Sequence, residues 1–150
     1  MAGFKGKYDH SVDDKGRVSL PSKIRKALTP EAKDSFVITR GYENSLVLYP
    51  LDAWNRYEAQ MTAELNTHRE EDRLFVRMIM MWAQEVTLDK QSRIMVPQEL
   101  MEISGITSQV VIIGALEKIE IWSPEYFRAY NERFADTTYE AVAARVMGGV

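Results

Sequence analysis

The sequence predicts an α+β fold made of two tandem, β-rich units, because one phrase occurs twice. Residues 13–21 (DDKGRVSLP) and 89–97 (DKQSRIMVP) are offset by 76 positions throughout. Both read as an acid, three polar or turn-forming residues, an Arg, three residues with apolar outer members, and a Pro. The strand and helix patterns after the two copies also match. We therefore expect a pseudo-symmetric chain in which each half supplies the same elements.

Each phrase predicts a tight turn that leads into a short strand. Asp and Gly are frequent in turns, and the apolar residues after each Arg favour a strand. After the Pro, a short helical stretch is expected in each half. These stretches are residues 22–28 and 98–103.

A β-hairpin and a longer helix complete each half. The hairpin strands are rich in β-branched residues, and turn-forming residues separate them. Pro50 and Pro124 then each begin an amphipathic helix, where Pro removes no intrahelical donor. The predicted hairpins pair residues 35–40 with 45–49, and 109–114 with 118–122.

A helical connector separates the two units. One helix is expected over residues 51–64, and apolar residues recur at helical spacing over 70–82. The apolar content of this connector is heavy for a simple linker. Two interpretations stay open: it forms inner core between the halves, or it forms a subunit interface.

The expected organisation has four parts. They are a first unit at residues 7–54, the connector at 55–82, a second unit at 83–126, and a C-terminal helix and tail at 127–150. A unit of about 50 residues buries too little surface to be secure alone, so the two units should pack together.

Composition narrows the class of protein. The chain has 150 residues, 45% of them hydrophobic, which is enough for a core. No apolar run approaches the roughly 18 residues that span a bilayer, and residues 1–8 lack the apolar part of a signal peptide. With no cysteine and two isolated histidines, His10 and His68, we expect no disulfide, metal site or cofactor. These features predict a soluble, cytoplasmic protein.

The sequence offers no arrangement typical of an enzyme. We find no nucleophile beside a base, no spaced carboxylate pair and no phosphate-binding loop. The nearest candidate is His10 close to Asp13, and a lone histidine is more often an ordinary surface residue. We therefore expect a protein without catalytic activity.

The net charge of -3 conceals an asymmetry along the chain. Residues 1–40 contain nine Lys and Arg against five Asp and Glu, or about +4, which leaves about -7 for the rest. A local positive face can hold phosphate even on an acidic protein, although it can also be an ordinary solvated surface. The basic residues near the first phrase are Lys5, Lys7, Lys15, Arg17, Lys23, Arg25 and Lys26.

The repeated phrase has the residues that nucleic-acid recognition requires. Asp13 and Asp89 can accept backbone N–H bonds and fix each turn, and Gly16 permits a positive φ. Arg17 and Arg93 each offer a planar fork that can bind guanine or phosphate with two hydrogen bonds. The alternative is an Asp–Arg ion pair that merely closes a hairpin. Both interpretations hold together if the acid orients the Arg.

These motifs resemble the MraZ family, bacterial transcriptional regulators of the division and cell wall gene cluster. The resemblance covers about residues 4–133 and rests on residues 4–8 (FKGKY), both Asp-x-x-x-Arg phrases, and residues 46–51 (LVLYPL) before Trp54. It implies that residues 7–54 and 83–126 are SpoVT-AbrB-type domains. Such domains would interlock as swapped hairpins into one pseudo-dimeric, β-barrel-like core flanked by helices.

The resemblance also implies a function. It implies a nucleoid-associated repressor that forms ring-shaped homo-oligomers and binds short direct repeats of double-stranded DNA in the promoter of its own operon. Carried over by position, it places DNA contact on the two arginines, while their aspartates shape the turns. Charge and position add the lysines. The residues expected at the DNA interface are Lys7, Asp13, Lys15, Gly16, Arg17, Asp89, Lys90 and Arg93.

The two copies are expected to be unequal. Ser92 stands where the second motif of the family often has Gly, so the second turn should be less strained or slightly different. The second half is also much less basic. We therefore expect the first turn to be the stronger DNA contact.

A second interpretation belongs to a different class of protein. The chain could be an antitoxin-like module that grips another protein through the Met-rich helix of residues 70–82, with DNA binding secondary. A stoichiometric partner that persists at high salt during purification distinguishes this class.

Overall fold

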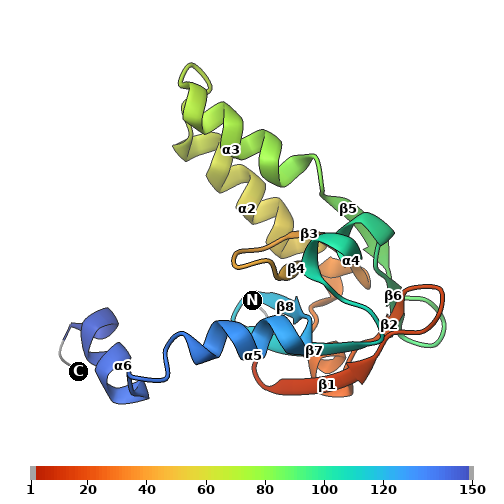
Figure 1. The fold of residues 1–150 in the computed structure, drawn as a ribbon. Helices are drawn as coiled ribbons and strands as arrows, with labels where there is room; N and C mark the ends of the chain where they lie inside the picture. Colours follow the sequence, from red (N-terminus) through yellow and green to blue (C-terminus); the bar gives the residue numbers. More distant parts are fainter. Residues whose placement is uncertain (1–2, 149–150) are drawn as a thin grey trace.

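A six-stranded antiparallel sheet forms the centre of the molecule (Figure 1). The computed structural model describes residues 3–148, which also contain a two-stranded sheet and six α-helices. The strands are β1 (Lys7–Ser11), β2 (Arg17–Ser19), β3 (Ser35–Arg40), β4 (Leu46–Pro50), β5 (Gln84–Thr87), β6 (Arg93–Met95), β7 (Gln109–Ala115) and β8 (Lys118–Trp122). The helices are α1 (Ser22–Lys26), the 3-10 helix η1 (Pro30–Ala32), α2 (Leu51–Glu64), α3 (Glu70–Met80), α4 (Gln98–Ser104), α5 (Pro124–Glu132) and α6 (Tyr139–Met147).

The two halves of the chain exchange strands within the larger sheet. Its strand order is β1-β7-β8-β4-β3-β5. β1 of the first half pairs with β7 of the second, and β5 of the second half pairs with β3 of the first. At the centre, β4 pairs with β8. Neither half therefore has a complete sheet of its own, which explains why such small units fold together.

The smaller sheet relates the halves by a pseudo-twofold axis. It consists of β2 and β6, and Val18 pairs with Ile94, its counterpart at the offset of 76. Both side chains are completely buried. The ladder continues at each end, where Leu20 N–H donates to the Ser92 carbonyl and Val96 N–H donates to the Gly16 carbonyl.

The main core contains side chains from both halves. Along each central strand, alternate residues point to the same side and enter this core. β3 contributes Phe36 and Ile38, and β7 contributes Val110 and Ile112. Each such side chain adds roughly 1.5–3 kcal/mol to stability through burial. The other large, completely buried members are Ile24, Leu46, Leu48, Ile94, Leu100, Ile119 and Ile121.

The connector helices α2 and α3 form a hairpin that projects from the sheet (Figure 1). A second apolar cluster joins Val37 of β3 to Trp54 of α2 and Ile79 of α3. The buried Thr39 hydroxyl donates to the Ile79 carbonyl at 2.8 Å, which fixes the end of α3 to β3.

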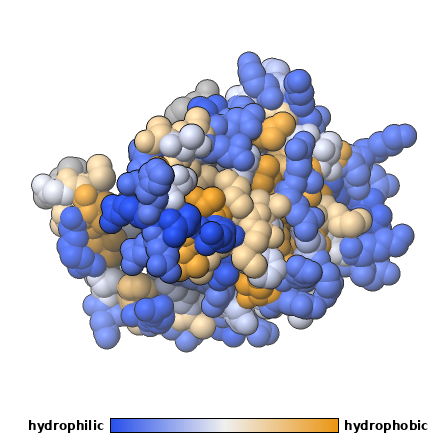
Figure 2. Space-filling view, turned by 90° about the horizontal axis from the view of Figure 1, so that it is seen from above, coloured by the Kyte–Doolittle hydropathy of each residue, from blue (hydrophilic) through white to orange (hydrophobic). Residues whose placement is uncertain are grey.

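One side of α3 is exposed rather than packed between the halves. Leu74, Met78 and Met81 are 52%, 45% and 68% exposed. Figure 2, which looks down onto this end of the molecule, shows apolar patches among hydrophilic side chains. Most of the connector packs on β3 and β4 in the second cluster, and Trp82 is its contribution to the main core, so the connector does not form the bulk of an inner core between the halves.

The α+β class, the two tandem units and the expected elements agree with the structure, but the barrel-like core is not closed. Within the described chain, β1 and β5 are the two edges of the larger sheet and do not pair with each other. The physical reason is local: each edge strand is followed at once by an Arg turn, which leads the chain into the smaller sheet. The tail contains α6, and residues 149–150 lie outside the described range.

No helix among residues 3–148 is long and apolar enough to cross a membrane.

Candidate nucleic-acid interface

The Asp13 carboxylate organises the first turn. Its Oδ1 atom accepts the backbone N–H groups of Lys15 and Arg17, both at 2.9 Å. Its Oδ2 atom accepts Nε–H of Arg17 at 2.6 Å. The Gly16 N–H closes the turn by donating to the Asp13 carbonyl at 3.0 Å. Arg17 is thus held through Nε, and its two terminal amino groups have no protein partner among residues 3–148.

The second turn repeats this geometry. Asp89 Oδ1 accepts the backbone N–H groups of Gln91 at 2.8 Å and Arg93 at 3.0 Å, and Oδ2 accepts Nε–H of Arg93 at 2.9 Å. The Ser92 N–H donates to the Asp89 carbonyl at 3.0 Å. Both copies therefore fix their Arg in the same way.

The prediction that Ser92 makes the second turn less strained or different is wrong. Ser92 has φ 61°, in the same left-handed region as Gly16 with φ 83°. A short polar side chain can adopt this conformation at a cost of roughly 1 kcal/mol. The second turn therefore keeps the same hydrogen bonds and is the more strained of the two.

Strand register places both half-buried arginines on one face, together with two exposed residues. Arg17 lies opposite Met95, and Ser19 lies opposite Arg93, so all four side chains share a face. The middle residue of each strand points the other way, into the core. We name residues 13–19 and 89–95 the paired-turn ribbon. Ser19 and Met95 were not among the expected interface residues, and only the pairing of β2 with β6 reveals them.

Asp13 also links the two turns. The Arg93 Nη1 atom lies 3.8 Å from Asp13 Oδ2, so one carboxylate contacts both arginines. The backbone N–H of Arg17 is the main cause that lowers the pKa of Asp13, to about 2, and the backbone N–H of Arg93 lowers the pKa of Asp89 in the same way. Both carboxylates are therefore ionised at neutral pH and hold the arginines in place. The sequence did not predict this cross-turn contact.

Each turn carries one exposed lysine at its tip. Lys15 lies in the first turn and Lys90 in the second. By the offset of 76, Lys90 is the counterpart of Asp14, and Gln91 is the counterpart of Lys15. The tip of the second turn is therefore no less positive than the first, despite its more acidic half.

The structure does not bring Lys7 to the paired-turn ribbon. Lys7 begins β1, and the turn follows the other end of that strand. The six residue steps to Asp13 span about 20 Å of extended chain. Lys7 instead pairs with Asp9 at 3.7 Å. Its expected DNA contact stays a prediction without support from proximity.

The fold and the site define a class of protein: an internally duplicated, strand-exchanged α+β protein that displays two aspartate-held arginines on a rigid two-stranded ribbon. The profile of the family described as "MraZ protein, putative antitoxin-like" matches residues 4–78 and again residues 79–148. The chain belongs to the MraZ family.

Relatives of known name agree with this assignment. The chain is 38% identical over 143 residues to "Transcriptional regulator MraZ" of Clostridium tetani, covering 95% of this chain and 96% of the relative. It is 40% identical over 144 residues to proteins of the same name from Syntrophomonas wolfei and Heliobacterium modesticaldum, covering 96% of each chain. The resemblance expected from the two Asp-x-x-x-Arg phrases is confirmed. These relatives are named as regulators, not as enzymes.

Proposed function

We propose that this chain is a sequence-specific DNA-binding transcriptional regulator that contacts DNA with the paired-turn ribbon. The observation that carries the proposal is the pair of half-buried arginines on one face of the ribbon, each held through Nε by an aspartate. The names of the relatives support the same function.

The ribbon suits the major groove of DNA. That groove is about 12 Å wide and admits a two-stranded β-ribbon. The terminal amino groups of Arg17 and Arg93 would donate to guanine O6 and N7, while Lys15 and Lys90 would contact phosphates. Because the aspartates already fix both arginines, little side-chain freedom is lost on binding. Since the hydrogen bonds of the two turns match, we propose that they act as one unit and not as a strong and a weak copy.

One chain alone should bind DNA weakly. The charged side chains of residues 13–19 cancel, and those of residues 89–95 sum to +1, so few phosphates are neutralised per chain. We therefore propose a ring-like homo-oligomer of head-to-tail subunits, which present their ribbons in the same sense and suit short direct repeats. We place these repeats in the promoter of the protein's own operon, which it represses, and the protein in the cytoplasm at the nucleoid.

We further propose that the exchanged strands are the swapped hairpins of two SpoVT-AbrB-type domains, at residues 7–54 and 83–126. The pairings of β1 with β7 and of β5 with β3 support this assignment. Residues 55–82 then form the connector between the domains, and residues 127–150 form the C-terminal helix and tail.

Footprinting on the DNA upstream of the protein's own gene, together with light scattering for subunit number, tests the function. We expect protection of several short, evenly spaced repeats and a mass of several subunits. Uniform or absent protection would contradict sequence-specific binding. A monomeric mass with intact protection would contradict only the proposed ring and would leave DNA binding supported.

A second candidate function is an antitoxin-like module that binds another protein through α3. The exposed side chains of Leu74, Met78 and Met81 favour it, and the family description contains the same term. Purification from the native cell at high salt tests this candidate. A stoichiometric partner that is lost in a Met78→Ser, Met81→Ser variant would support it, whereas purification of the chain alone would contradict it.

A further inference from the structure

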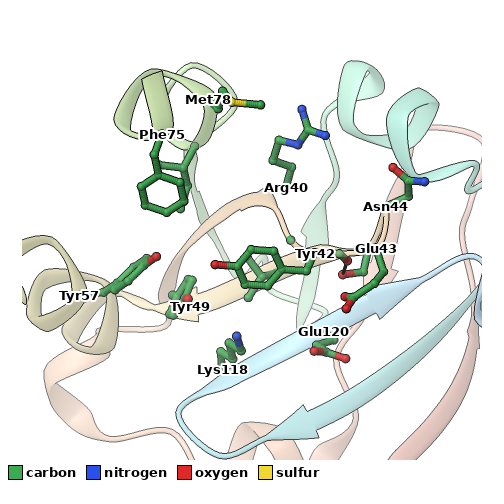
Figure 3. Close-up of a pocket in the computed structure, with 14 residues that line it drawn as sticks. Arg40, Tyr42, Glu43, Asn44, Tyr49, Tyr57, Phe75, Met78, Lys118 and Glu120 are labelled. Atoms are coloured by element: carbon green, nitrogen blue, oxygen red, sulfur yellow. Dashed lines mark hydrogen bonds between the residues drawn. The ribbon is translucent and has the colours of Figure 1, made fainter. Parts of the chain in front are cut away.

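A cavity of about 320 Å³ lies beside the helical hairpin, and none of its lining residues belongs to the paired-turn ribbon (Figure 3). Its walls come from α2, α3, β8 and the β3–β4 hairpin with its turn. This volume is in the range of sites that hold small molecules. The cavity can therefore be occupied without contact to the DNA-binding face.

Aromatic rings form much of the wall, and the surrounding packing fixes those of Tyr49 and Tyr57. Tyr49 and Tyr57 stack with ring centroids 5.2 Å apart and an interplanar angle of 19°. Phe75 of α3 and Tyr42 of the turn also line the cavity (Figure 3). The Ile79 carbonyl accepts the hydrogen bond that ties the end of α3 to β3, and Ile79 also lines the cavity. The cavity is thus formed before any ligand arrives.

Three phenol groups in this lining lack a protein partner. Among residues 3–148, the hydroxyls of Tyr42, Tyr49 and Tyr57 make no hydrogen bond, and none of them is a buried unsatisfied group. Burial raises the pKa of Tyr49 to about 12 and also raises the pKa of Tyr57. The hydroxyls of Tyr49 and Tyr57 therefore stay protonated at neutral pH and are available as donors.

The charged residues of the cavity are two cations and two carboxylates, and among residues 3–148 only the carboxylates have a side-chain hydrogen bond. Arg40 and Lys118 are half-buried and have no ion pair within the described residues. The two lining carboxylates already accept hydrogen bonds from aromatic side chains outside the cavity: Glu43 at 3.3 Å and Glu120 at 3.0 Å. Half-buried cations without partners favour a negatively charged ligand.

We propose that this cavity is a binding site for a small planar aromatic anion. The aromatic ring of the ligand stacks against the tyrosines. Its anionic group pairs with Arg40 and Lys118 and accepts hydrogen bonds from the phenols. This is a second site on the molecule, separate from DNA recognition.

The test compares two probes that differ by one charged group. 8-Anilinonaphthalene-1-sulfonate carries a flat ring system and a sulfonate, and N-phenyl-1-naphthylamine has the same rings without the sulfonate. Fluorescence titrations use the full chain and the variants Arg40→Gln and Lys118→Gln. Arg145→Gln is the matched control, because Arg145 is an exposed residue of α6 outside the cavity.

We expect the anionic probe to saturate one site per chain, and each cavity variant to weaken its binding about tenfold, the effect of one lost charge-assisted contact. The neutral probe should bind the cavity variants as tightly as it binds the parent. Arg145→Gln should bind the anionic probe as tightly as the parent does. Thermal unfolding of each variant checks that the fold is intact. Failure to saturate, or equal affinity in Arg40→Gln and Arg145→Gln, would overturn the proposal. So would a fall in oligomer mass as probe is added, because a second copy of the chain would then be the true occupant.

Discussion

Replacing Arg17 and Arg93 by Ala, singly and together, measures whether the paired-turn ribbon contacts DNA as one unit. Each Arg is held through Nε by its own Asp; both terminal amino groups of Arg17 lack a partner within residues 3–148, whereas Nη1 of Arg93 lies 3.8 Å from Asp13 Oδ2. A good bidentate contact to a base is worth about 1–3 kcal/mol of discrimination. Each single variant should therefore bind its own promoter roughly 5- to 150-fold more weakly per contact. The two losses should be similar because the two turns have the same hydrogen bonds.

The double variant should lose less than the sum of the two single losses. Arg93 lies 3.8 Å from Asp13, the carboxylate that holds Arg17, so the sites share a partner and are coupled. Fluorescence anisotropy on a labelled upstream fragment at several salt concentrations gives both the affinity and the salt slope. Loss of a phosphate contact reduces the slope by about 0.9, whereas loss of a base contact relaxes sequence preference.

Two further variants separate geometry from charge in the same assay. Arg17→Lys keeps the charge but lacks the planar fork, so it should restore phosphate binding and not base discrimination. Arg145→Ala removes a remote exposed charge and should bind as the parent does. If Arg17→Ala binds DNA more weakly while Arg93→Ala binds it as tightly as the parent, the two turns do not act as one unit. Parent-like affinity for both would refute the site.

Three other predictions concern stability. Ser92→Gly relieves a left-handed φ and should raise the free energy of unfolding by about 0.5–1 kcal/mol. Gly16→Ala should lower the free energy of unfolding, because a Cβ there lies 3.1 Å from a backbone carbonyl. Urea titration measures both, and changes of the opposite sign would contradict the strain at these positions. Ile119→Ala should lower the free energy of unfolding by about 2–5 kcal/mol, because Ile119 is completely buried. It should leave a single unfolding transition, because strands of both halves interleave in one sheet, and two separate transitions would contradict this. The pKa of Asp13 is lowered to about 2 in the folded chain, so its stabilisation is present above about pH 4 and lost as the pH falls toward 2, and the lowered pKa of Asp89 acts in the same direction. Thermal melts should show Asp13→Asn to be less sensitive over this range, and equal sensitivity would contradict the assignment.

The local elements could be predicted from the sequence because they depend on neighbouring residues. The turn phrases, the β-branched runs and the prolines before the long helices each mark an element by its own chemistry. The repetition at a fixed offset gave information about the relation between the two halves that no single pattern gives. It showed that residues 17–19 and 93–95 are equivalent, and the structure pairs those two segments with each other.

Strand partners could not be predicted in the same way. β1 is closer in sequence to β3 than to β7, yet it pairs with β7, because pairing depends on which apolar faces complete a common core. Lys7 shows the same limit: it is close to the first turn in sequence, but the length of β1 separates the two in space. Ser92 shows another, because a residue type does not by itself exclude a left-handed backbone. The cavity at Tyr49 and Tyr57 exists only once the connector is placed on the sheet.

The most direct test of the central claim places a DNA-cleaving reagent on each half of the ribbon. The chain has no cysteine, so Ser19→Cys and Met95→Cys each provide one attachment site for an iron chelate, on exposed and equivalent positions of β2 and β6. Thr67→Cys, at the exposed end of the helical hairpin, is the control. We predict that both ribbon reagents cut the promoter within the same few base pairs of each repeat and that the control does not. Cleavage from only one half, or none from either while the DNA is bound, would contradict recognition by the paired-turn ribbon.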